Sequence, residues 1–257
     1  MDPSAAERNT RAVEPEEYDR IHAHERDHFW YRGLHALFAG ALARALPGGP
    51  RRLLDAGCGT GGLLAVLARR FPQAQRVGFD FAPAALRLAA RRAGAPLVRA
   101  SIERVPFRDG CFDAVVSADV LYHRAVSDDA AALRELARVT RPGGVVLLNL
   151  PAHPELRGAH DAVIHTARRY ARADLVRMAA AAGLGVERLC WFNATLFPLA
   201  RWRRRRSAGG PARSDVALPP APINAILSAW LRAEAWWTLR LPLPVGLSLF
   251  AILRRPA

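Results

Sequence analysis

The segment that most constrains the fold is a run of glycines that directly follows a short apolar stretch. Residues 52–55 have the pattern of a buried strand, Gly57, Gly59 and Gly61 come next, and residues 63–71 have the pattern of a helix. Glycines suit such a turn because it is tight and because the backbone must approach a ligand closely, which a Cβ atom would prevent. This order predicts a ligand site at the carboxyl end of the strand.

Apolar runs and helical patterns alternate along the rest of the chain. Strands are expected at residues 52–55, 76–80, 96–100, 112–117, 145–150, 186–192 and 245–253, and helices at 63–71, 83–92, 128–139, 171–182 and 223–240. This alternation predicts an α/β fold with a doubly wound, mostly parallel seven-stranded sheet and helices on both faces. It also predicts a helical insertion between the last two strands.

The 257 residues are divided into two expected parts. Residues 1–32 are expected to form an N-terminal capping segment, with a helix from Glu16 to Tyr31, and residues 33–257 the main domain. The insertion, at about 199–241, is rich in arginine and tryptophan. Its helix carries one apolar stripe of Ile223, Ile226, Leu227, Trp230 and Trp237.

An acidic residue at the end of each of the first two strands narrows the choice of ligand. Asp80 closes the second strand 25 positions after Asp55, where a carboxylate can accept the two hydroxyls of a ribose. Two details disfavour a dinucleotide: an acid rather than a glycine ends the first strand, and Leu64 occupies the third glycine position of G-x-G-x-x-G when it is counted from Gly59.

Several motifs in residues 51–150 together resemble the class I, Rossmann-type S-adenosylmethionine-dependent methyltransferases, and in particular the type 11 group. The motifs are the glycine turn, Val77–Asp80, Ser101–Phe107, Phe112–Val116 and Arg141–Gly144. The resemblance implies S-adenosylmethionine as cofactor, with its methionine part at Gly57, its ribose at Asp80 and its adenine at Ile102. The implied cofactor residues are Asp55, Gly57, Cys58, Gly59, Gly61, Asp80, Phe81, Ser101, Ile102, Ala118 and Arg32.

The family also has an aromatic segment that covers the cofactor, which residues 28–32 resemble. Arg32 could pair with the cofactor carboxylate, and Trp30 or Tyr31 could cover the sulfonium by a cation–π contact. Packing of a capping helix on the domain explains the same aromatic residues equally well.

Polar residues that follow the fourth and fifth strands are candidates for the acceptor side. His165 lies four positions from both Asp161 and Arg169, so a helix would place the three on one face. Such a carboxylate–imidazole pair could remove the acceptor proton, and His123 is a rival base. The candidate catalytic residues are His165, His123 and Asp161, and the candidate acceptor contacts are Arg169, Tyr170 and His160.

The charge of the chain permits other functions. There are 37 basic and 23 acidic residues, which leave a net charge of +14, and every basic residue is arginine. Such an excess is compatible with RNA or with an anionic membrane, and the insertion is the expected place for peripheral membrane contact. DNA-methylating motifs (N/D-P-P-Y/F, Pro-Cys) are absent, so nucleic-acid methylation or binding, RNA above all, is only the alternative reading.

Metal binding and secretion are not expected. His24, Glu25 and His28 match H-E-x-x-H, but the third zinc ligand is missing. Three widely spaced cysteines and a polar start favour a reducing cytoplasm, with peripheral contact at the inner membrane surface as an option. The sequence therefore predicts a methyltransferase for a small-molecule or lipid-linked acceptor, with O-methylation favoured. Neither the acceptor nor the oligomeric state follows from it.

Overall fold

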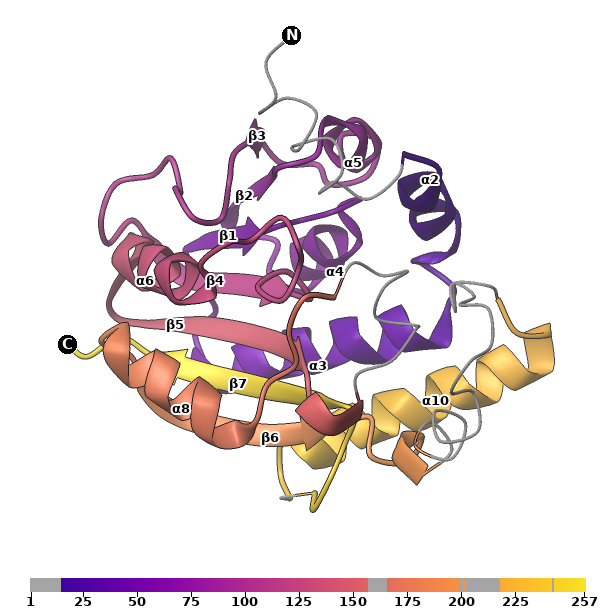
Figure 1. The fold of residues 1–257 in the computed structure, drawn as a ribbon. Coiled ribbons are helices and arrows are strands. Elements are labelled where there is room, and N and C mark those ends of the chain that lie inside the picture. Colours follow the sequence, from indigo (N-terminus) through magenta and orange to yellow (C-terminus); the bar gives the residue numbers. More distant parts are fainter. Residues whose placement is uncertain (1–14, 157–165, 199–200, 202–217, 242) are drawn as a thin grey trace, which may run out of the picture.

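A single seven-stranded sheet runs through the molecule, which is a computed structural model that describes residues 15–156, 166–198, 201, 218–241 and 243–257 (Figure 1). The strand order is β3-β2-β1-β4-β5-β7-β6, and β7 alone runs antiparallel to its neighbours β5 and β6. The strands are β1 (Arg52–Ala56), β2 (Gln75–Asp80), β3 (Leu97–Arg99), β4 (Phe112–Ala118), β5 (Thr140–Pro151), β6 (Gly185–Phe192) and β7 (Ser248–Arg254). The predicted fold class is confirmed.

Helices cover both faces of the sheet, as doubly wound topology requires. They are α2 (Pro15–His24), α3 (Phe29–Ala45), α4 (Gly62–Arg70), α5 (Pro83–Ala89), α6 (Asp129–Val139), α8 (Arg172–Ala181) and α10 (Ala221–Thr238), with a 3-10 turn at Pro154–Leu156. One hydrophobic cluster lies between the sheet and α6 and α8, and a second between the sheet and α3, α4 and α10. None of the described helices combines the length and the apolar character of a membrane-spanning segment.

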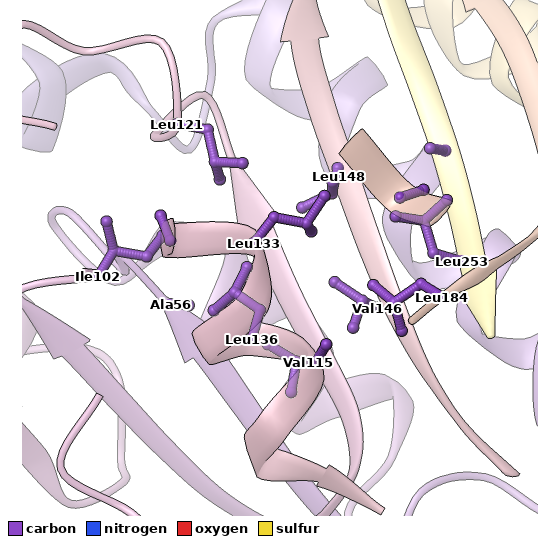
Figure 2. Close-up of a cluster of buried hydrophobic side chains, with 14 of the residues drawn as sticks. Ala56, Ile102, Val115, Leu121, Leu133, Leu136, Val146, Leu148, Leu184 and Leu253 are labelled. Atoms are coloured by element: carbon purple, nitrogen blue, oxygen red, sulfur yellow. The ribbon is translucent and has the colours of Figure 1, made fainter. Parts of the chain in front are cut away.

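The central strands are buried on both faces because each face carries a helix layer. Figure 2 shows Leu133 and Leu136 of α6 packed toward Val115 of β4 and Val146 of β5, all fully buried. Continuous apolar runs in β4 and β5 follow from this two-sided burial. The sheet therefore provides a rigid base for the loops at its carboxyl edge.

Two elements differ from the sequence-based expectation. The stretch expected as one helix over 16–31 forms α2 and α3, because the chain turns at residues 25–28 and His28 caps α3 by accepting a hydrogen bond from the Trp30 amide. Strand β5 begins at Thr140 rather than at Val145, and its pairing with β4 shifts register there. The arginine run 203–206 and His160, Asp161 and His165 lie outside the described residues.

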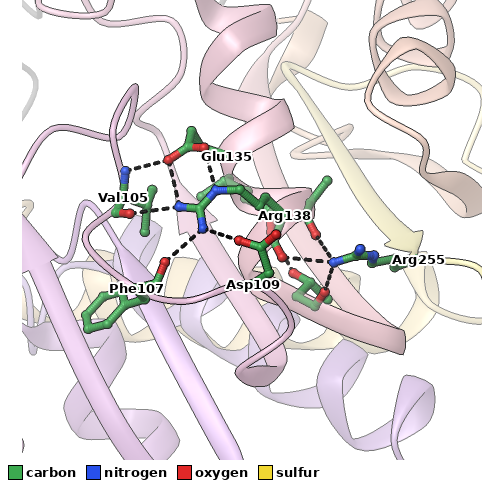
Figure 3. A network of polar contacts seen from close by, with 9 residues as sticks. Val105, Phe107, Asp109, Glu135, Arg138 and Arg255 are labelled. Atoms are coloured by element: carbon green, nitrogen blue, oxygen red, sulfur yellow. Dashed lines mark hydrogen bonds and ion pairs between the residues drawn. The ribbon is translucent and has the colours of Figure 1, made fainter.

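An arginine-centred network holds the loop that follows β3 (Figure 3). Arg138 donates to the carbonyls of Val105 and Phe107 and pairs with Glu135 and Asp109, while Glu135 accepts from the Val105 amide. Buried main-chain groups outside regular structure need such partners. The network therefore fixes the end of the segment in which the resemblance places the adenine site.

Candidate active site

The glycine turn lies at the carboxyl edge of the sheet, between β1 and α4. The amides of Gly57 and Cys58 both donate to the Phe79 carbonyl of β2, at 2.9 and 2.8 Å. Gly57 has a φ of 79°, and a Cβ atom there would overlap the methyl groups of Val120. A Cβ atom at Gly59 would meet nothing within 4 Å, so this part of the turn is open to a ligand.

Asp80 faces the open part of this turn. Its Oδ2 accepts from the Gly59 amide and its Oδ1 from the Ala82 amide, both at 2.9 Å. Burial raises the pKa of Asp80, and these main-chain donors oppose the rise. A carboxylate offers about four acceptor positions. Asp80 can therefore accept further hydrogen bonds from ribose hydroxyls, as its position at the end of β2 predicts.

Asp55, the acid at the end of β1, is almost completely buried. Its Oδ2 has no hydrogen-bond partner among the described residues, and 1% of the residue is exposed. Burial, reinforced by the negative charges of Glu25 and Asp80, raises the pKa of Asp55 to about 8. Buried polar atoms without partners are rare outside functional sites. The group is suited to a positively charged ligand.

Glu25 also reaches the glycine turn, which sequence analysis missed. Its Oε2 accepts from the Thr60 hydroxyl at 2.5 Å and from Arg92 at 3.0 Å. A Cβ atom at Gly62 would overlap the Glu25 carboxylate. Counted from Gly57, Gly62 completes G-x-G-x-x-G, so glycine spacing alone does not exclude a dinucleotide. Instead, a carboxylate occupies the N-terminus of α4, where a pyrophosphate would bind.

The H-E-x-x-H segment has a structural explanation. Glu25 is buried at the glycine turn and His28 caps α3. Among the described residues, no group of three or more metal-binding side chains comes together. The segment therefore shapes the entry of the chain into α3.

Two tyrosines lie at the acidic side chains of the site. Burial raises the pKa of Tyr31, and the negative charges of Glu25 and Asp119 add to it. Burial and the charge of Asp80 raise the pKa of Tyr18 in the same way. Trp30 instead packs on Phe192 of β6, with ring centroids 5.8 Å apart. Trp30 and Tyr31 were the two aromatic candidates to cover the sulfonium. Of these, Tyr31 lies near Glu25 and Asp119.

The remaining candidate cofactor residues differ in how deeply their side chains are buried. Cys58 and Ile102 are buried, Ile102 within the hydrophobic cluster of Figure 2. Phe81 is 40% exposed directly after Asp80, and the Ser101 hydroxyl accepts from the Glu103 amide. Ala118 ends β4 half-buried, and the side chain of Arg32 is exposed on α3.

Asp119, directly after β4, is a second residue that sequence analysis did not single out. It has a φ of 59°, and its Oδ1 accepts from the Asn149 side-chain amide of β5 at 2.9 Å. Oδ1 of Asn149 is buried and has no hydrogen-bond partner among the described residues. Burial raises the pKa of Asp119 to about 7, although the Asn149 bond opposes the rise. A left-handed backbone and a carboxyl that titrates near neutrality are both typical of functional positions.

The candidate acceptor-side residues that the structure describes already have hydrogen-bond partners within the chain. Tyr170 is 3% exposed and its hydroxyl donates to Asp129 at 2.7 Å, while Arg169 donates to the Ala152 carbonyl at 2.9 Å. Nδ1 of His123 accepts from the Ala125 amide at 3.1 Å. In the neutral ring the proton then lies on Nε2, which makes His123 a donor at that atom.

Comparison with known proteins agrees with this arrangement. Residues 54–148 match the family model described as a methyltransferase domain. Two relatives are the demethylmenaquinone methyltransferase of Thermus thermophilus (42% identical over 121 residues, 45% of this chain and 54% of the relative) and the malonyl-[acyl-carrier protein] O-methyltransferase of Dechloromonas aromatica (39% over 156 residues, 56% and 55%). The chain thus spans about half the length of the curated relatives it matches.

The fold is also that of solved methyltransferase structures. A SAM-dependent methyltransferase of Thermotoga maritima superimposes with a TM-score of 0.60 at 16% identity, over 93% of this chain and 95% of the other. At that identity the likeness concerns the fold alone. Residues 54–148 therefore match the methyltransferase domain that the family model describes, and the described chain has the fold of such enzymes.

Proposed function

We propose that the protein transfers a methyl group from S-adenosylmethionine to a small-molecule or lipid-linked acceptor. The observation that carries this proposal is the acidic cluster, which we define as Glu25, Asp55 and Asp80. No ion pair within the described part of the chain neutralises Asp55 or Asp80, and only Glu25 has a close arginine. Unpaired carboxylates favour a cationic ligand over a pyrophosphate.

The residues of the turn have separate roles in this proposal. Asp80 accepts the ribose hydroxyls, Asp55 faces the cationic methionine part, and the loop at Ile102, held by Arg138, receives the adenine. Bound S-adenosylmethionine supplies an electrophilic methyl group on a sulfonium. Because methyl transfer is an in-line displacement, the protein has to position the acceptor and remove its proton where the acceptor is a hydroxyl.

Asp119 is the proposed base for an O-methylated acceptor. Its pKa of about 7 lets it take up a proton at neutral pH, and Asn149 orients it at the carboxyl edge, where its charge acts on Tyr31. His165, which sequence spacing alone pairs with Asp161, stays a second candidate. His123 is less suited, since its acceptor nitrogen already receives the Ala125 amide.

The choice of acceptor class is supported by the relatives. Their names refer to demethylmenaquinone and to malonyl-[acyl-carrier protein], that is, to a quinone and to a carrier-linked acid. A small-molecule or lipid-linked acceptor belongs to the same chemical classes as these two substrates. Peripheral contact with a membrane would serve such an acceptor.

Calorimetry tests the cofactor. S-adenosylmethionine should bind and NADH should not, and Asp80→Asn should weaken binding by about 1.5–3 kcal/mol, the range for hydrogen bonds to a charged group. Glu187→Gln, which changes an acid of the edge strand β6 that pairs with Arg254, is the matched control. Incubation with metabolite and lipid extracts should then produce S-adenosylhomocysteine. Binding of NADH without S-adenosylmethionine would refute the proposal.

A further inference from the structure

Helix α10 exposes several large apolar side chains, while its buried face combines polar residues with Leu231 and Ala235. Ser228, Glu234 and Thr238 are buried, whereas Ile226 and Trp230 are 69% and 48% exposed. Seven of the ten large exposed hydrophobic residues of the described chain lie between residues 218 and 241, so the exposure is concentrated on this element. They are Leu218, Ile223, Ile226, Trp230, Trp236, Trp237 and Leu241. We call this surface the α10 apolar face.

The orientation of α10 is fixed by specific contacts on its buried side. Glu234 accepts from the Ala194 amide at 2.7 Å and from the Thr195 hydroxyl at 2.8 Å, beyond the end of β6. Leu231 packs so closely on Gly33 of α3 that a Cβ atom there would overlap it. Rotation that buried the tryptophans would break these contacts and leave the half-buried Ala194 amide without its acceptor.

The neighbouring parts of the sequence do not have the composition of a cover for this face. Residues 202–217 contain five arginines and one aspartate, with Trp202 and Val216 as the large apolar residues. A concentrated exposed apolar surface of this kind is typical of a site that meets an apolar partner.

The charged residues of α10 indicate which kind of partner binds the α10 apolar face. The exposed side of α10 carries Arg232, Arg240 follows the helix, and the only acid of α10 is the buried Glu234. The Arg240 guanidinium lies 3.8 Å from the centre of the Trp236 ring. Tryptophan with arginine, without exposed acids, is typical of helices that lie in the interface of an anionic bilayer. We propose that α10 docks the protein on an anionic lipid surface.

The same helix is joined to the cover of the site. Oδ1 of Asn224, in the first turn of α10, accepts from the Phe29 amide at 3.0 Å, and its Nδ2 donates to the Asp27 carbonyl at 2.8 Å. These residues adjoin the turn from which Glu25 reaches the glycine turn. Docking through α10 would thereby be coupled to the segment that reaches the glycine turn, near which a lipid-linked acceptor would enter. In this last point the inference rests on the proposed function.

Vesicle flotation tests the docking surface. The protein should float with vesicles of phosphatidylcholine that contain about one third phosphatidylglycerol, and about tenfold less with phosphatidylcholine alone or at high salt. The double variant Trp230→Gln/Trp237→Gln should lose about tenfold or more of its partition coefficient. Val176→Gln, which removes an exposed valine of α8, should bind as the parent does.

Two outcomes would overturn the proposal. One is equal flotation of the parent and the double variant while both keep the same melting temperature. The other is a parent dimer that ignores anionic vesicles and that the double variant dissociates, which would make a second copy the partner. S-adenosylmethionine affinity measured without vesicles keeps the two proposals apart, since docking can fail while cofactor binding holds.

Discussion

Carboxylates at the two ends of the sheet differ in their partners and in the direction of their pKa shifts. At the carboxyl edge, Asp55 is buried and Asp119 is half-buried, and neither has a cationic partner among the described residues. Loss of solvent contact raises the pKa of Asp55 to about 8 and that of Asp119 to about 7. At the amino edge, Arg138 hydrogen bonds lower the pKa of Glu135. Burial would raise the pKa of Asp113, but bonds from the Arg52 amide and Arg141 lower it. Arginines of the chain therefore neutralise these amino-edge acids, whereas Asp55 and Asp119 have no such partner among the described residues.

This contrast separates structural charge from functional charge. A carboxylate that meets its arginine and its main-chain donors stabilises the fold and has no need of a ligand. A buried carboxylate without such partners lowers stability and persists where a ligand or a reaction uses it. Asp55 and Asp119, which have no arginine partner among the described residues, belong to the second kind, and the Arg138 network of Figure 3 belongs to the first.

The largest expected effect concerns turnover. Asp119→Asn should lower kcat about a hundredfold or more, because the amide cannot accept the acceptor proton, while S-adenosylmethionine affinity stays within a few fold. In the parent, the rate should rise with pH through about 7, as the carboxyl loses its proton. Steady-state kinetics across pH measures both. Unchanged turnover would move the base to His165, tested by His165→Gln.

Next in size is the stability of the amino edge. Arg138→Met should lower the free energy of unfolding by about 2–3 kcal/mol, because the Val105 and Phe107 carbonyls lose their donor and Glu135 its partner. Urea denaturation measures the change. Arg134→Met, whose partner is exposed and 3.7 Å away, is the control and should cost less than about 1 kcal/mol. Equal losses in both variants would remove the contrast between the two ends.

The smallest expected effect is a pH dependence of the unliganded protein. The folded pKa of Asp55 lies above its ordinary value, so its contribution to stability is present below about pH 4 and is lost as pH rises to about 8. Asp55→Asn should flatten this pH dependence, because the amide does not ionise. Unfolding at pH 5 and pH 8 measures it.

A cationic ligand beside Asp55 should also release a proton at pH 7. Calorimetry in two buffers with different ionisation enthalpies detects that proton. A binding enthalpy that is independent of the buffer would show that Asp55 is already ionised in the free protein.

Much of the carboxyl edge could be predicted because its signals are local. The apolar runs, the glycines and the spacing from Asp55 to Asp80 all reflect backbone requirements of neighbouring residues. Glu25 could not be found in this way, since its segment also matches a zinc motif and its contacts are with Thr60 and Arg92, far along the chain. Asp119 was not singled out either, because its hydrogen-bond partner Asn149 belongs to another strand.

The apolar stripe of α10 separates what the sequence determines from what only the tertiary structure decides. Helical periodicity by itself determined that Ile223, Ile226, Trp230 and Trp237 share a face, as it determined the strands and the glycine turn. Which face meets the core was decided only by tertiary structure, where Glu234 binds the chain beyond β6 and Leu231 packs on α3. The period of apolar residues in the sequence fixes the directions of side chains around one helix or strand. Their burial is set by packing partners that are distant in sequence.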